Sequence, residues 1–295
     1  MSMSARAGRW ANIRGRCATR PKKNKTYRPH PPCFSITGAD ALFPACRLPD
    51  ALFFRRNALF FTYADDLPPD AGFALYSPPH LAALALAAAL CLSAVRRPLS
   101  ERTSRALGLA ILLSELLRMT VYAGMGCLNR FELPLHLCSL AVFLCALHSI
   151  RKPDWLGQTL YALCLPGACA ALLFPDWVVY PFFSFISLHC FVSHTLIVLY
   201  IVSETTRGSI RPRLSALWKP MLFLCAAVPP VSLFNRHFGT NYMFLQLPSP
   251  GSPLVGLAQL SGGNPAGYLA LLIAAVAGCM ALMELPFALA HRRKP

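Results

Sequence analysis

Seven apolar segments of helical length constrain the fold of this 295-residue chain more than any other feature. They begin after Phe73, follow one another closely, and cover residues 81–95, 106–125, 133–150, 156–174, 180–203, 215–235 and 265–290. Most of them reach the ~20 residues that an α-helix needs to cross about 30 Å of hydrocarbon. The sequence therefore predicts an all-α fold, a polytopic membrane helix bundle of about seven transmembrane helices, over residues 71–295.

Composition supports lipid as the solvent of this part of the chain. Hydrophobic residues make up 55% of the sequence and charged residues only 14%, and the mean hydropathy is +0.47. Soluble domains carry about 25% charged residues, because water has to solvate their surface. The composition thus excludes an ordinary soluble domain.

Residues 1–70 form a separate unit of basic composition. They hold 12 of the 28 Lys and Arg residues and mix proline, phenylalanine and charge without a sustained apolar period. Such a segment buries too little apolar surface to order itself, so we predict a basic, disordered N-terminal extension. Because it contains no recognisable nucleic-acid-binding module, no nucleic acid partner is expected.

The charges of the loops predict an orientation. If the first span begins outside, the inner segments hold 13 Lys and Arg residues, and the later outer loops hold two, Arg130 and Arg236. Short loops rich in Lys and Arg stay on the cytoplasmic side. We therefore expect a multi-pass protein of the cell membrane with a cytoplasmic C-terminus and with the 236–264 loop outside.

The twelve cysteines do not form a recognisable framework. Nine of them, from Cys91 onward, lie in or beside the apolar segments, and the sequence has no CxxC motif and no Cys/His zinc spacing. Cysteine behaves as a small apolar residue when it is buried. We expect free buried thiols in this part of the chain, no metal site and no cofactor.

Glu115 and Arg118 are charged residues within the second apolar segment. Their i, i+3 spacing places them on one helix face, close enough to pair. Charged groups are costly in lipid and are kept there for a reason. One interpretation is contact with a lipid headgroup; the other is a structural ion pair that fixes helix packing.

Thiol and imidazole groups occur in the third and fifth segments. His136 and Cys138 lie in LPLHLCSL, and His189 and His194 lie in FISLHCFVSHTL. Counting 1.5 Å per residue from the segment ends puts Cys138 about 8 Å, His189 about 13 Å and His194 about 21 Å deep. Each histidine alone is more often a helix–helix hydrogen-bonding group. Together with the thiol they predict a site, and depth favours His189 as the partner of Cys138.

The 236–264 loop is rich in proline, glycine and serine and contains the dipeptide Asn241-Tyr242. An amide and a phenol offer hydrogen-bond donors to a lipid headgroup or to an oxyanion. The alternative is that Asn241 caps a turn and Tyr242 anchors the chain at the membrane interface, as aromatic residues do.

Several short motifs occur in a fixed order between Phe73 and the C-terminus. They are FALYSPPHL (73–81), LPLHLCSL (133–140), LFPDWVVYP (173–181), the segment around His194, GTNYMFLQLPSPGSPL (239–254) and ELPF (284–287). In their order and spacing they resemble the YwaF family of bacterial integral membrane proteins. These are relatives of the eukaryotic transmembrane protein 164, a polytopic acyltransferase that acts on ether phospholipids. Residues 1–70 lie outside the resemblance.

The resemblance implies an integral membrane protein that is a cysteine-dependent acyltransferase acting on membrane phospholipids. It implies that Cys138 is the acyl-accepting nucleophile and that His194 is the matching histidine base. His189 stands where the family usually has an apolar or aromatic residue. The family match therefore favours His194, the depth estimate favours His189, and we place His194 first.

The chemistry is consistent with these residue types. Acyl transfer needs a nucleophile, a base and donors for the tetrahedral oxyanion. Membrane lipids are the expected partners, with a phospholipid as substrate, and the sequence sets no oligomeric state. A small-molecule or ion transporter and a non-catalytic membrane scaffold stay open as alternatives, although the two related halves common in transporters are not visible.

Overall fold

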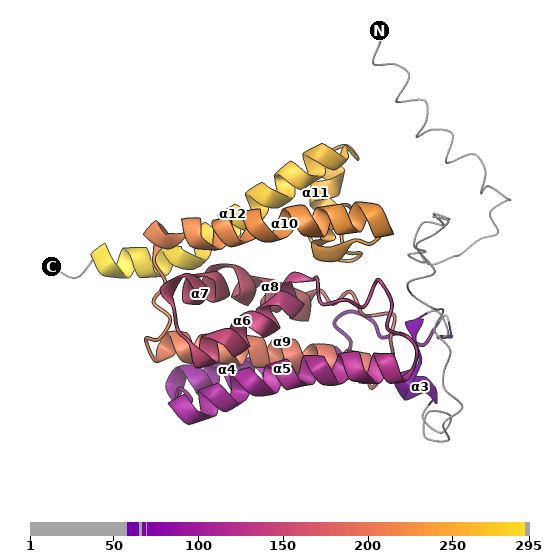
Figure 1. Ribbon diagram of the computed structural model, residues 1–295, viewed down its shortest axis with the longest axis horizontal. Helices are drawn as coiled ribbons and strands as arrows, with labels where there is room; N and C mark the ends of the chain where they lie inside the picture. The colour runs from indigo at the N-terminus through magenta and orange to yellow at the C-terminus, as the bar shows by residue number, and fades with distance from the viewer. Residues whose placement is uncertain (1–57, 65–66, 69, 293–295) are drawn as a thin grey trace, which may run out of the picture. The chain divides into compact units, whose positions relative to one another are not determined.

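The computed structural model describes residues 58–64, 67–68 and 70–292, which form helices and connecting segments without a strand (Figure 1). The helices are α3 (Ala58–Phe61), α4 (Pro78–Arg96), α5 (Glu101–Gly124), α6 (Leu137–Ile150), α7 (Asp154–Thr159), η3 (Leu160–Cys164), α8 (Leu165–Leu173), α9 (Phe185–Thr206), η4 (Leu214–Ala216), α10 (Trp218–Phe238), η5 (Tyr242–Phe244), α11 (Leu254–Leu260) and α12 (Pro265–Arg292).

Every predicted apolar segment contains a helix or a continuous run of helices, although α6 begins at Leu137 instead of residue 133 and α9 begins at Phe185 instead of residue 180. In the described part of the chain, six of them are long and apolar enough to cross a membrane, and these are α4, α5, the run α7–η3–α8, α9, η4–α10 and α12. The seventh, α6, is apolar but has only 14 residues. The predicted all-α membrane bundle is therefore confirmed, with one span shorter than expected.

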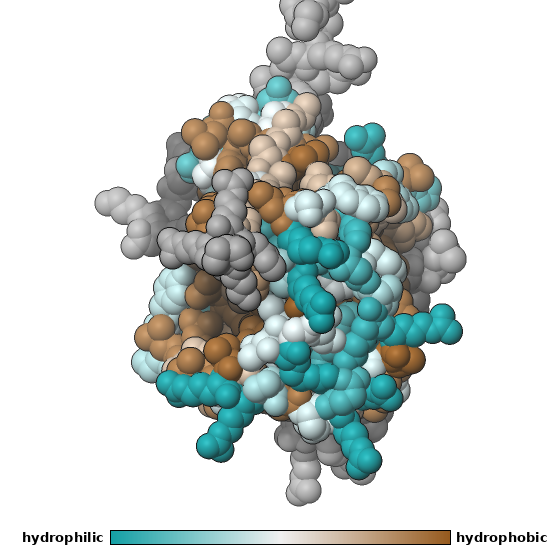
Figure 2. Space-filling model, turned by 90° about the vertical axis from the view of Figure 1, so that its left-hand side faces the viewer, coloured by the Kyte–Doolittle hydropathy of each residue, from teal (hydrophilic) through white to brown (hydrophobic). Residues whose placement is uncertain are grey.

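Successive spans run in opposite directions, so their connections gather at two ends of the bundle. The basic end carries residues 97–100, 151–153 and 207–217, and the loop-rich end carries residues 125–136, 174–184 and 239–264. Figure 2 looks onto the basic end, where hydrophilic residues gather between apolar flanks.

Local sequence signals set the helix starts. The Ser100 hydroxyl accepts the N–H of Thr103 at the start of α5, and the Ser184 hydroxyl accepts the N–H of Ser187 at the start of α9. Serine at this position satisfies a backbone donor that has no partner inside the helix. α4 instead begins with prolines, whose missing N–H is not needed in a first turn.

A single π-helical turn, η3, interrupts the span between α7 and α8. Pro166 has no N–H, so the carbonyl four residues before it loses its usual partner. The N–H of Leu165 bonds the carbonyl of Leu160, five residues back. Single π turns of this kind often mark functional sites, and here the turn brings Cys164 to the wall of a cavity.

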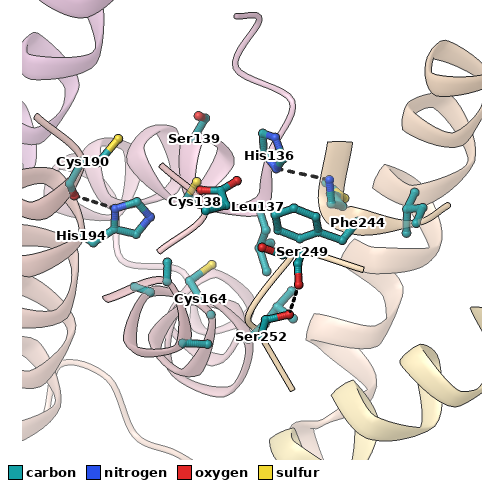
Figure 3. A pocket seen from close by; sticks show the side chains of 18 of the residues that line it. His136, Leu137, Cys138, Ser139, Cys164, Cys190, His194, Phe244, Ser249 and Ser252 are labelled. Carbon is teal, nitrogen blue, oxygen red and sulfur yellow. Dashed lines mark hydrogen bonds between the residues drawn. The ribbon is translucent and has the colours of Figure 1, made fainter. Parts of the chain in front are cut away.

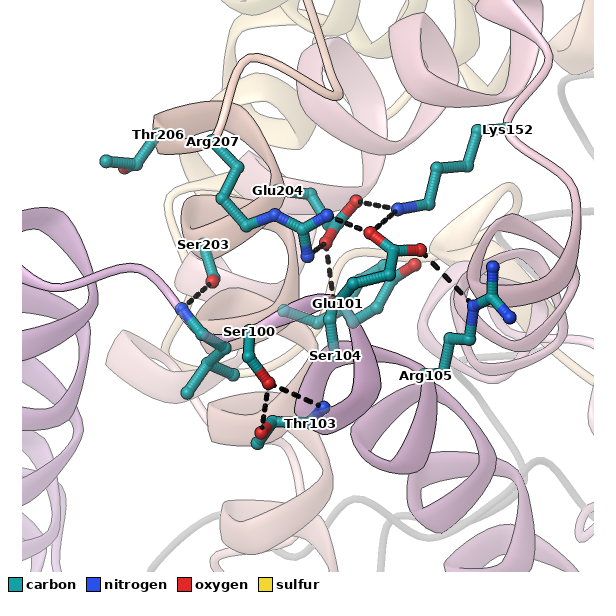
Figure 4. A network of polar contacts seen from close by, with 12 residues as sticks. Ser100, Glu101, Thr103, Ser104, Arg105, Lys152, Ser203, Glu204, Thr206 and Arg207 are labelled. Atoms are coloured by element: carbon teal, nitrogen blue, oxygen red, sulfur yellow. Dashed lines mark hydrogen bonds and ion pairs between the residues drawn. The ribbon is translucent and has the colours of Figure 1, made fainter.

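An ionic network around the buried Glu204 ties the basic end together (Figure 4). Glu204 of α9 is fully buried and accepts hydrogen bonds from the Ser104 hydroxyl (2.5 Å) and from Arg207 (2.8 Å). Lys152 lies 3.0 Å from Glu204 and 2.8 Å from Glu101, which also pairs with Arg207. The network joins α5, α9 and the α6–α7 connection.

The packed structure begins before residue 71. Tyr63 is buried; its hydroxyl donates to Glu132 (3.0 Å) and accepts from the Asn129 amide (3.2 Å). The ring of Phe61 packs against Phe185 of α9, 5.6 Å between centroids. Part of the segment predicted as an extension is thus packed on the bundle, because buried hydrogen bonds and ring contacts hold it. Residues 1–57 lie outside the described residues.

Candidate functional site

A cavity of about 870 Å³ opens within the bundle. One wall comes from α5, α6, α8 and α9, and the other from α10, α12 and the 243–254 segment. This volume falls within the range of about 300–1,000 Å³ that is usual for small-molecule sites. The cavity is therefore large enough to hold a substrate.

The lining of the cavity changes from polar to apolar. The polar side chains come from the part of the bundle nearest the loop-rich end, and they include Glu115, Arg118, Glu132, His136 and Asp176. Apolar side chains from the deeper parts of η3, α10 and α12 complete the lining, among them Leu163, Met221, Leu224, Val228, Leu272 and Val276. An amphipathic molecule with one polar end matches this distribution.

Cys138 lies in the first turn of α6 and carries a free thiol. The first backbone N–H that bonds within this helix belongs to Leu140, which donates to the carbonyl of His136 (3.0 Å). No side chain caps the helix, and the N–H groups of its first turn have no partner inside the helix, as at any helix start. These donors lie beside the thiol and favour negative charge there.

The short length of α6 explains how Cys138 lies inside the bundle. A 14-residue helix spans about 21 Å, roughly 9 Å less than the hydrocarbon core. With its other end at the basic end, its first turn is recessed from the loop-rich end. The sequence estimate counted depth from residue 133 and therefore placed this turn too near the surface.

His194 of α9 offers an unused ring nitrogen to the same cavity. Its Nδ1 lies 2.7 Å from the carbonyl oxygen of Cys190 and must donate to it. The neutral ring therefore has its lone pair on Nε2, which is buried and has no hydrogen-bond partner among the described residues. The indole of Trp177 stacks on the ring at 5.2 Å. Figure 3 shows the ring extending from the Cys190 carbonyl toward Cys138.

His189 lines the cavity as well, but its ring is tied to α5. Its Nε2 donates to the carbonyl of Ser114 (3.1 Å) and lies 3.2 Å from the Ser193 hydroxyl. The same nitrogen is 3.9 Å from Glu115. Its Nδ1 is buried without a partner among the described residues. Both histidines of α9 thus keep one unused lone pair.

Glu115 and Arg118 pair as their spacing predicts. The guanidinium donates to Glu115 at 2.7 and 3.2 Å. It also donates to the carboxylate of Glu132 (3.1 Å) and to its main-chain carbonyl (3.1 Å). Two carboxylates therefore hold one guanidinium, an arrangement that fixes geometry at the loop-rich end. Sequence spacing did not reveal Glu132, because it reaches Arg118 from a loop.

Asn241 and Tyr242 bond within the protein and do not line the cavity. The side-chain carbonyl of Asn241 accepts the N–H groups of Gln246 (3.1 Å) and Leu247 (3.2 Å), as in a capped turn. The Tyr242 hydroxyl donates to the carbonyl of Arg130 (2.7 Å) and accepts the N–H of Leu133 (2.9 Å). These contacts hold the 239–254 segment against the start of α6.

Asp176 is a cavity residue that the sequence analysis did not single out. It precedes Trp177 in the connection between α8 and α9, and it lines the cavity together with Cys138, His136 and His194. Its carboxylate makes no hydrogen bond or ion pair with a residue that the structure describes. The motif LFPDWVVYP contained the signal, since an acid between apolar residues is unusual there, but only the fold brings it to the thiol.

The prediction that these cysteines are free holds with one exception, but the prediction that they are buried holds only in part, since Cys145 and Cys164 are buried whereas Cys225 and Cys279 are exposed. Of the nine cysteines from Cys91 onward, eight are free, and Cys127 is disulfide-bonded. Cys127 follows α5 at the loop-rich end, outside the helical spans, so the expectation of a lipid-buried thiol is wrong for it. In the described part of the chain, no group of three or more His, Cys, Asp or Glu side chains is placed to hold a metal ion.

The fold and the cavity define a multi-pass, all-helical membrane protein with an amphipathic internal site. The chain belongs to the TMEM164 family, whose model matches residues 75–284. The resemblance to relatives of transmembrane protein 164 is thereby confirmed. No curated protein and no solved structure matches the chain.

Proposed function

We propose that this protein is a cysteine-dependent acyltransferase that acts on membrane phospholipids. One observation carries the proposal. The free thiol of Cys138 and the unused Nε2 of a neutral His194 line one cavity, which is polar at one end and apolar at the other. A nucleophile, a base and room for an amphipathic acyl donor are the parts that acyl transfer requires.

The first half-reaction transfers the acyl group to the enzyme. Nε2 of His194 takes the proton of the Cys138 thiol while the sulfur attacks the ester carbonyl carbon of a phospholipid. When the tetrahedral intermediate collapses, the ester C–O bond breaks. The imidazolium gives its proton to the departing alkoxide, which leaves as a lysophospholipid. Cys138 then carries the acyl chain as a thioester.

The second half-reaction restores the enzyme. The hydroxyl of an acceptor lipid loses its proton to His194 and attacks the thioester carbonyl. The C–S bond breaks and the proton returns to the sulfur, so the two halves involve no net oxidation and no further reactant. In both halves the N–H groups at the start of α6 support the oxyanion, because they have no partner inside the helix.

Asp176 supplies negative charge beside the base. As His194 becomes an imidazolium, an unpaired carboxylate on the same cavity wall stabilises it. The stacked ring of Trp177 and the Cys190 carbonyl restrict the imidazole to one orientation. His189 is the second choice as base, because its ring is bonded to α5.

A lipid-turnover assay tests the proposal. The purified protein is placed in phosphatidylcholine vesicles that contain a deuterated lysophosphatidylcholine, and acylation of the labelled lipid is followed by mass spectrometry. The wild type and Cys279→Ala, which alters an exposed cysteine outside the cavity, should acylate the lysolipid, and Cys138→Ala should not. Equal turnover by Cys138→Ala, or none by the folded wild type, would favour the transporter or scaffold alternatives.

The proposed orientation places the basic end in the cytoplasm of a cell-membrane protein. The excess of basic residues at this end follows the positive-inside rule. The disulfide at Cys127 adds support, since disulfides form on the oxidising side of a membrane and Cys127 lies at the opposite, loop-rich end. A Ser209→Cys variant should resist an impermeant thiol reagent in intact cells, and labelling from outside would reverse the assignment.

A further inference from the structure

Two histidines on the cavity wall have opposite hydrogen-bonding states. His194 donates from Nδ1 to a carbonyl, which leaves a lone pair on Nε2. His136 does the reverse, because its Nδ1 accepts the main-chain N–H of Met243 (3.3 Å). A neutral imidazole has one N–H and one lone pair, so the proton of His136 is on Nε2. Figure 3 shows this bond as a dashed line from His136.

The His136 ring is half-buried, and its surroundings favour the neutral form. Burial lowers its pKa, and the nearby carboxylate of Asp176 only partly opposes that shift. The ring packs between Tyr242 (4.9 Å) and Phe244 (5.4 Å), which limits its rotation. Nε2 makes no hydrogen bond to a described residue, so its N–H remains free for a ligand.

The segment that fixes this tautomer is itself held in an unusual backbone conformation. Met243 and Phe244 both have positive φ, 57° and 53°. Residues other than glycine rarely adopt this region, and they do so where the surrounding structure forces them. The result of the strain here is a main-chain N–H aimed at an imidazole nitrogen.

Asn235 of α10 helps to hold the 242–244 backbone in this conformation. Its side chain is fully buried, donates to the carbonyl of Tyr242 (2.9 Å), and accepts the N–H of Tyr242 (2.9 Å) and the hydroxyl of Thr240 (2.8 Å). The hydroxyl of Tyr268 on α12 holds the carbonyl of Phe244 (2.9 Å). The motif GTNYMFL thus acts on the site indirectly, by presenting the N–H of residue 243.

We propose that His136 is an oxyanion donor of the acyl-transfer site. Its Nε2–H donates a hydrogen bond to the carbonyl oxygen of the acyl group as that oxygen becomes negative. The N–H groups of the first turn of α6, which begins one residue after His136, act on the same oxygen. This role rests on the proposed function. It gives the two histidines separate tasks, since His194 has the lone pair of a base and His136 the N–H of a donor.

Two reactions of Cys138 distinguish the role of an oxyanion donor from that of a base. Acylation by p-nitrophenyl palmitate in detergent micelles passes through an oxyanion, whereas alkylation by iodoacetamide does not. Peptide mass spectrometry of the full-length protein measures both rates at Cys138. The variants are His136→Leu, which removes the N–H, His136→Gln, whose amide restores an N–H near the same place, and His194→Asn. His237→Leu, at an exposed histidine outside the cavity, is the matched control.

The expected pattern is specific. His136→Leu should slow acylation by about 100-fold, the usual effect of losing one oxyanion donor, with the alkylation rate kept. His136→Gln should recover part of the acylation rate, His194→Asn should lose both rates, and His237→Leu should lose neither.

Other patterns would contradict the inference. If His136→Leu were acylated at the wild-type rate, His136 would not be an oxyanion donor. If His136→Leu and His136→Gln both lost acylation and alkylation in parallel, the role of His136 would be purely structural. If the wild type were alkylated at Cys138 but never acylated, the proposed function itself would fail, and the role of His136 with it.

Discussion

Two clusters of polar side chains lie at different depths of the same bundle and differ in how far they are satisfied. At the basic end, Glu204 is fully buried and has partners on Ser104, Lys152 and Arg207. On the cavity wall, Nε2 of His194 is buried without a partner among the described residues. In the first cluster both oxygens of the buried carboxylate have partners, although Oε2 of Glu204 has only the ion pair with Lys152. In the second cluster the lone pair on Nε2 of His194 is unused.

This difference separates a structural network from a site. Buried polar groups in proteins are nearly always hydrogen-bonded, and an unpaired one costs about 1–3 kcal/mol. Under the proposed function, the unpaired Nε2 of His194 lowers stability but leaves a lone pair for the base. The comparison predicts that substitutions in the network change stability and that substitutions on the cavity wall change rate.

The largest effect is expected from Glu204→Ala. Removing this carboxylate leaves Lys152 and Arg207 with Glu101 alone, and breaking a buried ion pair typically costs about 3–5 kcal/mol. Thermal unfolding in detergent should show a large loss of stability. Turnover per folded molecule should stay as in the wild type. Unchanged stability would show that the network around Glu204 does not stabilise the fold, contrary to the comparison.

The next effect concerns the base. His194→Asn keeps a donor for the Cys190 carbonyl but removes the Nε2 lone pair, and His189→Gln keeps a donor for Ser114 but removes the Nδ1 lone pair. Loss of a general base lowers the rate about 100-fold or more. We expect that loss in His194→Asn at near-normal thermal stability. If His189→Gln shows it instead, the depth estimate from sequence was the better guide.

Asp176→Asn should have a smaller effect on rate. The substitution keeps the size of the side chain and removes the negative charge that stabilises imidazolium on His194. One pKa unit of differential stabilisation corresponds to about tenfold, and we expect a loss of that size in acylation of Cys138. Asp176→Glu should restore most of it. Equal acylation rates in Asp176→Asn and Asp176→Glu would show that the negative charge at this position does not affect acylation of Cys138.

The smallest effect is expected from Tyr63→Phe, which tests the segment before residue 71. The substitution removes the hydrogen bonds to Glu132 and Asn129, while Arg118 still holds Glu132. A net loss of about 1 kcal/mol is usual for such a change, measured by thermal unfolding in detergent. No loss at all would show that this segment contributes only apolar contacts.

Much of the fold was predictable because few kinds of structure are stable across a lipid bilayer. Apolar segments of about 20 residues indicated the spans, and the i, i+3 spacing indicated the Glu115–Arg118 pair. The length of α6 was not predictable from hydropathy, since Leu133, Pro134 and Leu135 before it continue the apolar segment without being helical. That difference moved Cys138 deeper than sequence counting allowed.

The site was predictable only in part, because its members come from distant segments. The motif resemblance indicated Cys138 and His194. Asp176 lay within a quoted motif, yet nothing local shows that its loop meets the thiol. The tautomer of His136 depends on Met243, which is 107 positions away. Contacts of this kind follow from the packing of α6 against the 239–254 segment and leave no periodic signal.

The central claim is that Cys138 forms a thioester. Its most direct test is the mass of the intact protein after incubation with phosphatidylcholine vesicles and no acceptor lipid. We predict a gain of one acyl chain that neutral hydroxylamine removes, present in Cys279→Ala and absent in Cys138→Ala. An unmodified wild-type protein, or an equal adduct on Cys138→Ala, would contradict the account.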